Sequence, residues 1–342
     1  MHPKDAGPLY DLLCVPSLLS CGHVEPAEEF PAFQEFVSQP QGDQHRLVAV
    51  CDGQPVGLGI LERPANPRVA HLGQISLLAI PEWRNLDIGA DLLKTLIDIA
   101  DSWLNLKRLE AEVPKNIPAV QRSFQQAGFV KEGIRKKAIY GEGQFQDEVS
   151  MARLRGFDVR GDAGRRPAPE PPIPSGRKVS ELLIRPLAEQ DADELYEIYR
   201  APENCRTTLQ MPSQELWLTN KRIRERSVDL QRLVAVAGKQ VVGIITMKRF
   251  SQRCRAHAAG LGMTVHTDYW GLGIGSRLVE RAMELADGWL NLTRVELIVH
   301  TDNPAGIRLY EKFGFEVEGR KPFHTYGGGG WVDSYFMARV AD

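Results

Sequence analysis

A run of alternating glycines in the second half of the chain has the composition of an anion site. The run is Tyr269-Trp-Gly-Leu-Gly-Ile-Gly275. Gly271, Gly273 and Gly275 bare consecutive backbone N–H groups, and the positive end of a following helix adds to their attraction for negative charge. The chemistry predicted is pyrophosphate binding, although the run alone is equally typical of a flexible turn. It matches neither G-x-G-x-x-G, because Ser276 stands at the last glycine, nor the P-loop, because no Gly-Lys-Ser/Thr follows.

The elements that position this loop are predicted by hydrophobic periodicity. The loop joins an expected strand, 258–265, which contains Gly260 and Gly262, to an expected amphipathic helix, 274–290. Glycine inside a strand often marks a bulge or the close approach of a ligand. The other expected strands are 182–186, 233–236, 241–247, 294–300 and 335–340, and the other expected helices are 191–200, 217–227 and 304–313. This order predicts an α/β or α+β fold, with a mixed central sheet flanked by helices.

The two halves of the chain are copies of one domain. Arg46-Leu-Val-Ala-Val50 recurs as Arg232-Leu-Val-Ala-Val236, and Met151-Ala-Arg153 recurs as Met337-Ala-Arg339, each 186 positions later. A repeat this long is a domain duplication rather than a solenoid unit. We predict a first domain at 1–154, a Pro/Gly-rich, semi-rigid linker at 155–180 and a second domain at 181–342.

The first copy has no counterpart of the expected strand 182–186. Met1 aligns with Leu187 at the same offset. Either the first domain lacks its opening strand, or the true start of translation lies upstream.

Composition limits the class of protein. The chain has 342 residues, of which 43% are hydrophobic and 25% charged, as expected for two ordinary folded domains. Its net charge of −2 gives no global field for nucleic acid or an anionic membrane. No apolar run reaches the ~20 residues that span a bilayer. Five cysteines without a C-x-x-C pair favour a reducing cytoplasm, and eight histidines without a His-x-x-x-His pair predict no metal site.

A second motif follows the glycine loop by about thirty residues. It reads Asn303-Pro-Ala-Gly-Ile-Arg-Leu-Tyr310, and Gly314-Phe315 comes soon after. With the glycine loop, it resembles the GCN5-related N-acetyltransferase (GNAT) family over the whole of 182–342. The resemblance implies acetyl-CoA as co-substrate, with its pyrophosphate on the loop and its pantetheine along the strand. The cofactor-binding residues implied are Met263, Thr264, Val265, Trp270, Gly271, Leu272, Gly273, Ile274, Gly275, Ser276 and Asn303.

The resemblance also implies the mechanism. A neutral amine attacks the thioester directly, backbone N–H groups of the glycine-containing strand hold the oxyanion, and Tyr310 protonates the departing thiolate as the catalytic general acid. One departure is Trp270, which occupies the family's Arg/Gln position and removes a side-chain donor or charge there.

The acceptor is less defined. In this family the acceptor cleft is built partly by the loop between the two early helices, which here predicts Arg206, Thr208 and Gln210 as substrate-binding residues, with Arg206 facing a carboxylate. The segments 207–212 and 331–337 resemble the L-amino acid N-acyltransferase branch, so the expected acceptor is an amino acid or an analogue. The alternatives are protein N-termini, an antibiotic amine or polyamine, and an acetyl-CoA-sensing protein without turnover.

The first copy differs at three of these positions. Gly273 corresponds to Asp87, Asn303 to Ile117 and Tyr310 to Phe124, so we expect a degenerate domain that neither binds acetyl-CoA normally nor catalyses. His257 and Glu296 are matched by identical residues in the first copy, which favours a role in the fold. We also expect the first domain to pack on the second, in a monomer or a homodimer.

Overall fold

The structure is a computed structural model that describes residues 6–13, 30, 34–35, 43–79, 88–141, 143–158, 164–167, 179 and 181–341. The chain divides into two compact units, residues 1–163 with 252–254 and residues 164–251 with 255–342. Of the expected linker 155–180, the described residues 155–158 belong to the first unit, and the described residues 164–167 and 179 belong to the second.

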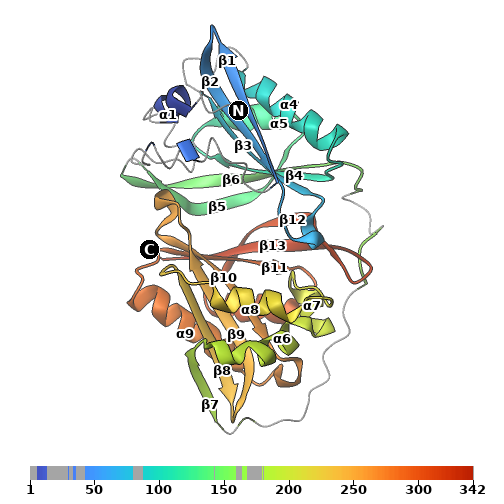
Figure 1. Cartoon of the computed structure of the whole chain (residues 1–342), viewed down its shortest axis with the longest axis vertical. Helices are drawn as coiled ribbons and strands as arrows, with labels where there is room; N and C mark the ends of the chain where they lie inside the picture. The colour runs from blue at the N-terminus through green and yellow to red at the C-terminus, as the bar shows by residue number, and fades with distance from the viewer. Residues whose placement is uncertain are drawn as a thin grey trace. The chain divides into compact units, whose positions relative to one another are not determined.

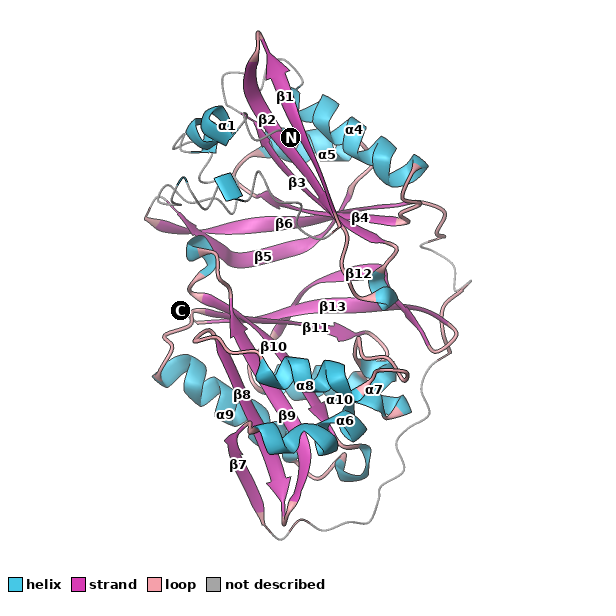
Figure 2. Cartoon of the chain, in the orientation of Figure 1, coloured by secondary structure: helices cyan, strands magenta, loops and turns pink. Residues whose placement is uncertain are grey.

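The second unit is built on a mixed sheet (Figures 1 and 2). Its strands, in spatial order, are β7 (Leu182–Pro186), β8 (Leu230–Ala237), β9 (Gln240–Arg249), β10 (Ala258–Val265), β11 (Arg294–His300), β13 (Gly330–Val340) and β12 (Glu316–Gly327). Neighbouring strands are antiparallel except β10 and β11, which are parallel. The expected mixed sheet is confirmed.

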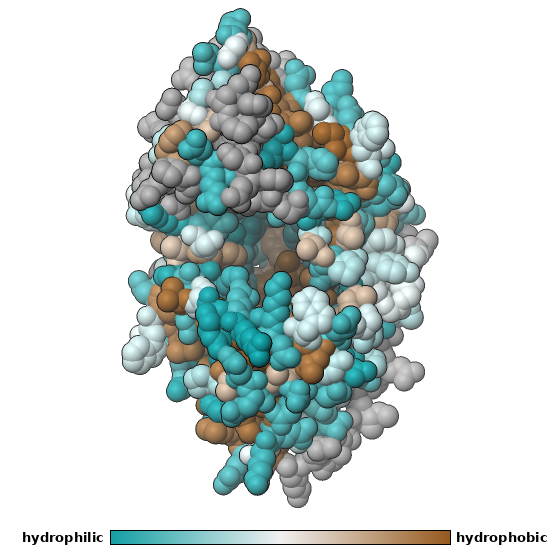
Figure 3. Space-filling view, viewed as in Figure 1, coloured by the Kyte–Doolittle hydropathy of each residue, from teal (hydrophilic) through white to brown (hydrophobic). Residues whose placement is uncertain are grey.

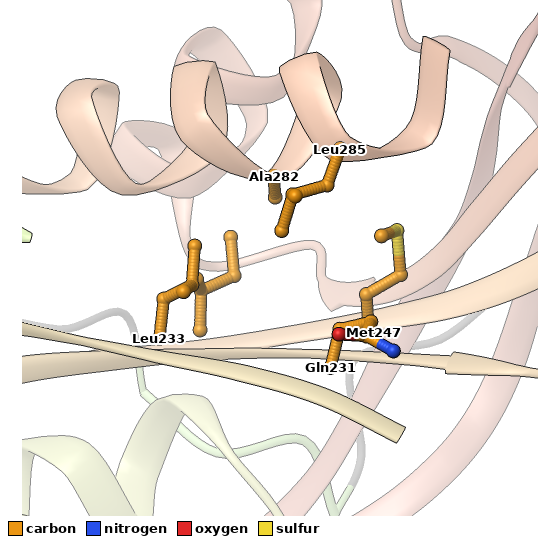
Figure 4. Close-up of a pocket in the computed structure, with 6 residues that line it drawn as sticks. Gln231, Leu233, Met247, Ala282 and Leu285 are labelled. Carbon is orange, nitrogen blue, oxygen red and sulfur yellow. The ribbon is translucent and has the colours of Figure 1, made fainter. Parts of the chain in front are cut away.

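Helices cover both faces of this sheet. On one face, α6 (Ala192–Arg200) and α8 (Leu216–Arg224) pack on Val234 and Ile244, and the short α7 (Pro202–Thr207) lies between them in the chain. On the other face, α9 (Ile274–Gly288) and α10 (Pro304–Lys312) contribute to the larger core. Figure 4 shows Ala282 and Leu285 of α9 facing Leu233 and Met247 of the sheet. The crevice there is apolar apart from Gln231, as expected for core packing rather than for a site.

Strands β10 and β11 separate after three residues. Their parallel pairing runs from Ala258 opposite Arg294 to Gly260 opposite Glu296, whereas β10 stays paired with β9 as far as Val265. The edge of β10 that faces β11 is therefore without ladder partners beyond Gly260, and its backbone groups there are available to a ligand.

The first unit repeats this plan. Its strands, in spatial order, are β1 (Gln44–Cys51), β2 (Gln54–Glu62), β3 (Leu72–Ala79), β4 (Arg108–Pro114), β6 (Gln144–Leu154) and β5 (Val130–Gly141), and its helices are α1 (Ala6–Leu13), α4 (Ile88–Ser102) and α5 (Pro118–Gln126). Strands β3 and β4 are also parallel over three residue pairs only. The separation of the two parallel strands is thus a property of the fold in both copies.

Some expected elements of the second unit need correction. Strand β12 was not predicted, and β13 begins at Gly330 rather than at 335. A bulge explains the omission, because the β12–β13 register shifts between Lys321 and Thr325 and interrupts the alternation of apolar residues. Within the bulge Phe323 has a left-handed φ of 52°, and its N–H donates to Asp333 at 3.0 Å. The helix expected at 217–227 ends at Arg224.

In each unit a buried arginine lies where the two parallel strands are still paired. Arg294, 1% exposed, donates to Glu296 at 2.8 Å and to both carboxylate oxygens of Glu318 at 2.9 and 2.6 Å. In the first unit Arg108 binds the matching glutamates. Glu296 therefore has the structural role that its match in the first copy suggests.

No helix among the described residues has the length and apolarity needed to cross a membrane.

We predict that Arg294→Met lowers the free energy of unfolding of the second unit by about 3–5 kcal/mol, because Glu318 is left buried without its counter-charge. Urea unfolding followed by circular dichroism measures the change. The control is Arg339→Met, which removes the more exposed pair with Asp287 and should cost about 1 kcal/mol or less. Equal losses in the two variants would show that the buried network is not the stronger restraint.

Candidate active site

The glycine loop has the backbone conformation of an anion cradle. Gly271 and Gly273 have left-handed φ values of 76° and 80°, and Gly273 is the N-cap of α9. Both glycines are exposed, and a Cβ on either would meet nothing within 4 Å. The first backbone bond into α9 runs from Arg277 N–H to the Gly273 carbonyl, so the N–H groups of the preceding helical residues have no intrahelical acceptor. The loop therefore offers N–H donors and open space to a pyrophosphate.

Gly275 has a different role, which is close packing. A Cβ at this position would lie 3.0 Å from Leu309 of α10 and 3.3 Å from Met263 of β10. The absent side chain lets the start of α9, strand β10 and helix α10 meet at one point. The structure thus brings together the three segments that the sequence singled out for the cofactor.

The other loop residues divide between backbone and side-chain roles. Trp270 turns its indole N–H back to the Val265 carbonyl at 2.9 Å, so that it braces the loop against the end of β10. Ile274 is 1% exposed and belongs to the core, which leaves only its backbone for a ligand. Leu272 is exposed and Ser276 is partly exposed in the first turn of α9. Thr264 is buried on β10.

Asn303 caps the helix that carries the proposed acid. Its side-chain oxygen accepts from the Gly306 N–H at 3.0 Å, and its amide nitrogen would lie only 2.7 Å from a Cβ on Gly306. In the first unit, Ile117 holds nearly the same backbone conformation without a side-chain cap. The backbone turn is therefore a property of the fold, and the amide of Asn303 is an addition of the second copy.

Tyr310 is buried at the end of α10. Its ring packs 5.7 Å from that of Phe315, and the residue is 8% exposed. Burial raises the pKa of the Tyr310 hydroxyl to about 12, so the phenol keeps its proton throughout the physiological range. Phe124 occupies the same place in the first unit and packs on Phe129 at 5.0 Å. Because the ring is kept and only the oxygen differs, the hydroxyl is not needed for folding.

The three predicted acceptor residues have different partners, although the Gln210 N–H donates to the Thr208 hydroxyl at 3.2 Å. Arg206 donates to the Pro167 carbonyl and lies 3.4 Å from the Asp302 carboxylate, so the structure places it in an ion pair within the protein. Thr208 uses its hydroxyl locally, donating to the Asn204 carbonyl at 2.7 Å. Gln210 lines a cavity, and its side-chain oxygen accepts from Arg222 at 2.6 Å.

That cavity, of about 320 Å³, lies between α6, α8 and the sheet. Two of its residues, Thr246 and Lys248, lie directly opposite Gly262 and Gly260 in the β9–β10 register. Residues paired in this way point to the same face, so the cavity adjoins the part of β10 that leaves β11. The lining residues are Leu187, Tyr199, Gln210, Arg222, Ile223, Glu225, Leu230, Arg232, Ile244, Thr246 and Lys248.

Three cations and one carboxylate line the cavity, and the cations are not equivalent. The Arg232 guanidinium donates hydrogen bonds to backbone carbonyls at the end of α8. Lys248 forms an ion pair with Glu225 at 3.3 Å. Arg222 donates through Nη1 to Gln210 and Gln214, and its Nη2 and Nε have no partner among the described residues. Figure 3 shows a largely hydrophilic surface over α8, whose last turn carries further basic side chains. Arg222 is therefore the cation at the cavity whose Nη2 and Nε can donate hydrogen bonds to a ligand.

Most of the polar lining differs in the first copy. At the offset of 186, Arg222 corresponds to Phe36, Tyr199 to Leu13, Gln210 to Val24, Thr246 to Ile60 and Lys248 to Glu62. Arg232 corresponds to Arg46 and is shared. Our sequence analysis missed Arg222. The comparison of the two copies at this position could have identified it.

The first copy's loop 80–87, with Arg84, Asn85 and Asp87, lies outside the described residues, so its loss of pyrophosphate binding stays a prediction. Among the residues that the structure describes, no three His, Cys, Asp or Glu side chains are grouped to hold a metal ion.

Comparison with known proteins agrees with this arrangement. The sequence model of the Acetyltransferase (GNAT) family matches residues 9–129 and 192–315. The L-amino acid N-acetyltransferase AaaT of Escherichia coli is 34% identical over 162 residues, which are 47% of this chain and 99% of that protein. The spermidine N(1)-acetyltransferase of Vibrio cholerae is 28% identical over 140 residues, 41% of this chain and 81% of that protein. A GNAT acetyltransferase of Streptococcus pneumoniae matches at 27% identity with a TM-score of 0.43, over 47% of this chain and 100% of its own.

We predict that one phenol of the folded protein ionises near pH 12 and that Tyr310→Phe removes it. An unfolded tyrosine releases its proton near pH ~10. The contribution of Tyr310 to the free energy of unfolding is therefore complete below pH 10 and is lost as the pH rises toward 12. The measurement is the difference in phenolate absorbance between wild type and variant. A midpoint near 10 in the folded protein would contradict the burial of this hydroxyl.

Proposed function

The chain belongs to the GNAT family of N-acetyltransferases, and on this basis we propose that its second unit transfers an acetyl group from acetyl-CoA to the primary amine of a small amino acid or a close analogue. The observation that carries the proposal is the cavity beside β10, with Arg222 positioned to bind a carboxylate. The similarity to an L-amino acid N-acetyltransferase supports the same acceptor class.

The residues present fit acetyl-CoA. Gly271 and Gly273 leave open space beside unpaired N–H groups, and β10 leaves its ladder with β11 beyond Gly260. We propose that Met263, Thr264 and Val265 line the pantetheine, and that the loop from Trp270 to Ser276 binds the pyrophosphate. The amide of Asn303 contacts the same arm.

The chemistry proposed is a direct transfer. Acetyl-CoA supplies, when bound, a thioester carbonyl that the amine attacks. A new C–N bond forms and the C–S bond breaks. Backbone N–H groups of β10 stabilise the negative charge on the carbonyl oxygen. Tyr310 gives its proton to the sulfur, and the amine loses a proton to solvent. Holding both reactants on either side of β10 supplies proximity.

Charge argues against a polyamine as acceptor. The cavity contains Arg222, Arg232 and Lys248 against the single carboxylate of Glu225. A polycation would meet like charges there, whereas an amino acid presents its carboxylate to Arg222. Spermidine is therefore the natural negative control in the assays below.

The first unit is proposed to be inactive. Phe124 has no proton to give, although it keeps the ring packing of its counterpart, and Ile117 has no side-chain amide, although it keeps the backbone turn. We expect calorimetry to find one acetyl-CoA per chain, whereas two would contradict this proposal.

We predict that Tyr310→Phe lowers kcat by about 10²–10⁴-fold, because the departing thiolate loses its acid. The dissociation constant of acetyl-CoA should stay within twofold, since the ring is kept. Release of the CoA thiol across a panel of L-amino acids measures turnover, and calorimetry measures binding. The matched control is Phe124→Tyr, which should leave turnover unchanged. Full activity in Tyr310→Phe would reject Tyr310 as the acid.

We predict that Arg222→Leu raises the KM of the acceptor amino acid by about 10- to 100-fold, the loss expected for a hydrogen bond between charged groups. The corresponding decarboxylated amine should be affected less than twofold, because it never used the guanidinium. Arg224→Leu, on the same helix, is the control for charge. A loss that is equal for the amino acid and for its amine would show that Arg222 does not recognise the carboxylate.

A further inference from the structure

A segment of the linker is built into the second unit. The carbonyl of Gly164 accepts from the Trp331 N–H at 2.8 Å, and the Arg166 N–H donates to the Trp331 carbonyl at 3.0 Å. Arg165 thereby forms a parallel bridge with Trp331 at the start of β13. We call Gly164–Pro167 the strap.

Both arginine side chains of the strap form ion pairs, Arg165 with Asp333 and Arg166 with Asp302. The pair made by Arg166 is the one that reaches the site. The Nε and Nη2 of Arg166 donate to the two oxygens of Asp302, each at 2.7 Å, in a bidentate pair. Its Nη2 also lies 3.3 Å from Nδ1 of His300. Arg166 is 7% exposed, so this ion pair is shielded from water. Bidentate geometry fixes direction as well as distance.

The strap joins two loops that border the proposed site. Arg206 of α7 donates to the Pro167 carbonyl and also contacts Asp302, while His300 Nδ1 lies 3.0 Å from the carbonyl oxygen of Arg206. Asp302 immediately precedes Asn303, the cap of α10. Through one carboxylate, the strap therefore holds both the loop after α7 and the start of the helix that carries Tyr310.

The sequence of the second unit makes room for the strap. A Cβ on Gly330 would lie 2.5 Å from the backbone nitrogen of Arg166, a contact that no side chain permits. The φ of Gly330 is not in the left-handed region, so the strap and not the backbone conformation requires glycine here.

The first copy lacks the means to hold such a segment. Its residue matching Gly330 is Gln144, and the residue matching Asp302 is Asn116. Asp333 also contacts the strap, because it accepts from Arg165, and the first copy keeps it as Asp147. This aspartate accepts from the bulge N–H of its own hairpin at 3.0 Å in both units. The glycine and the aspartate that receive the backbone and side chain of Arg166 thus differ between the copies, while the bulge and its aspartate are shared.

We propose that Arg166 is a positioning residue of the acetyltransferase reaction, supplied by the linker. It holds Asp302, and through it the turn at Asn303 and the loop after α7, in the arrangement that binds acetyl-CoA and the acceptor. Arg206 is then a structural partner of the strap and not the carboxylate anchor that its sequence position suggested. For its kinetic readout the inference rests on the proposed function.

The test compares four variants of the full chain. Arg166→Leu removes the ion pair, and Gly330→Ala displaces the strap without changing any charge. Arg166→Asp with Asp302→Arg reverses the pair and should restore it in part. Arg339→Leu removes another bidentate pair of the same unit, with Asp287, and is the matched control.

We expect Arg166→Leu and Gly330→Ala to lower kcat/KM for the acceptor by about 10- to 100-fold. Both variants should also raise the dissociation constant of acetyl-CoA by at least about threefold, because Asn303 is held less firmly. Hydrogen exchange at Trp331 should accelerate in both variants. The reversed pair should recover at least a third of the lost kcat/KM, and Arg339→Leu should stay within twofold of wild type.

Two results would overturn the proposal. The first is fast exchange at Trp331 with kcat/KM and acetyl-CoA binding within twofold of wild type, which would make the strap a tether only. The second is a rise in activity on release, which would make it an inhibitor. If the wild type fails to acetylate any amino acid, the proposed function fails, and the acetyl-CoA dissociation constants of Arg166→Leu and Gly330→Ala still decide the role of the strap.

Discussion

The parting of β10 from β11 is the constraint on which the second unit depends. Two parallel strands that hydrogen-bond over three residues and then diverge leave an unpaired backbone edge in the middle of a sheet. The N–H and C=O groups of such an edge must pair with water or with a ligand. The buried Arg294, held by two glutamates, fixes the closed end of the divergence, and the packing of Gly275 against Met263 and Leu309 fixes the open end. The glycine loop, α10 and the cavity beside α8 are all arranged around that edge.

The duplication separates what folds the domain from what adapts it. Both units keep the separated parallel strands, the buried arginine and the aspartate-held bulge. Among their differences are single groups set on that common frame: a hydroxyl on an aromatic ring and an amide on a helix cap. Because the ring packing and the backbone turn are kept where these groups are missing, the fold does not depend on them.

Local chemistry was predictable from the sequence, and its tertiary partners were not. Left-handed glycines at 271 and 273 and a helix beginning after Asn303 follow from short-range rules. The role of Arg206 does not, because its partners Pro167 and Asp302 are distant in the chain. Trp103 and Trp289 illustrate the same limit: they occupy matching positions in the two copies, which by itself favours a packing role, yet both are more than four-fifths exposed. The neighbouring Asn105 and Asn291 do form the turn, with φ values of 49° and 48°.

The strap also gives the order of the two copies a meaning. Its residues precede β7, outside the repeated sequence, and they reach their partners only from the N-terminal side of the second copy. If the two copies exchanged places in the gene, the chain would keep every strand and helix of both folds. The copy that contains Asp302 would then no longer follow the linker that supplies Arg166. The linker would instead precede the copy in which Gln144 replaces the glycine that makes room for it. In a duplicated protein, the position of a copy along the chain can thus be part of its active site.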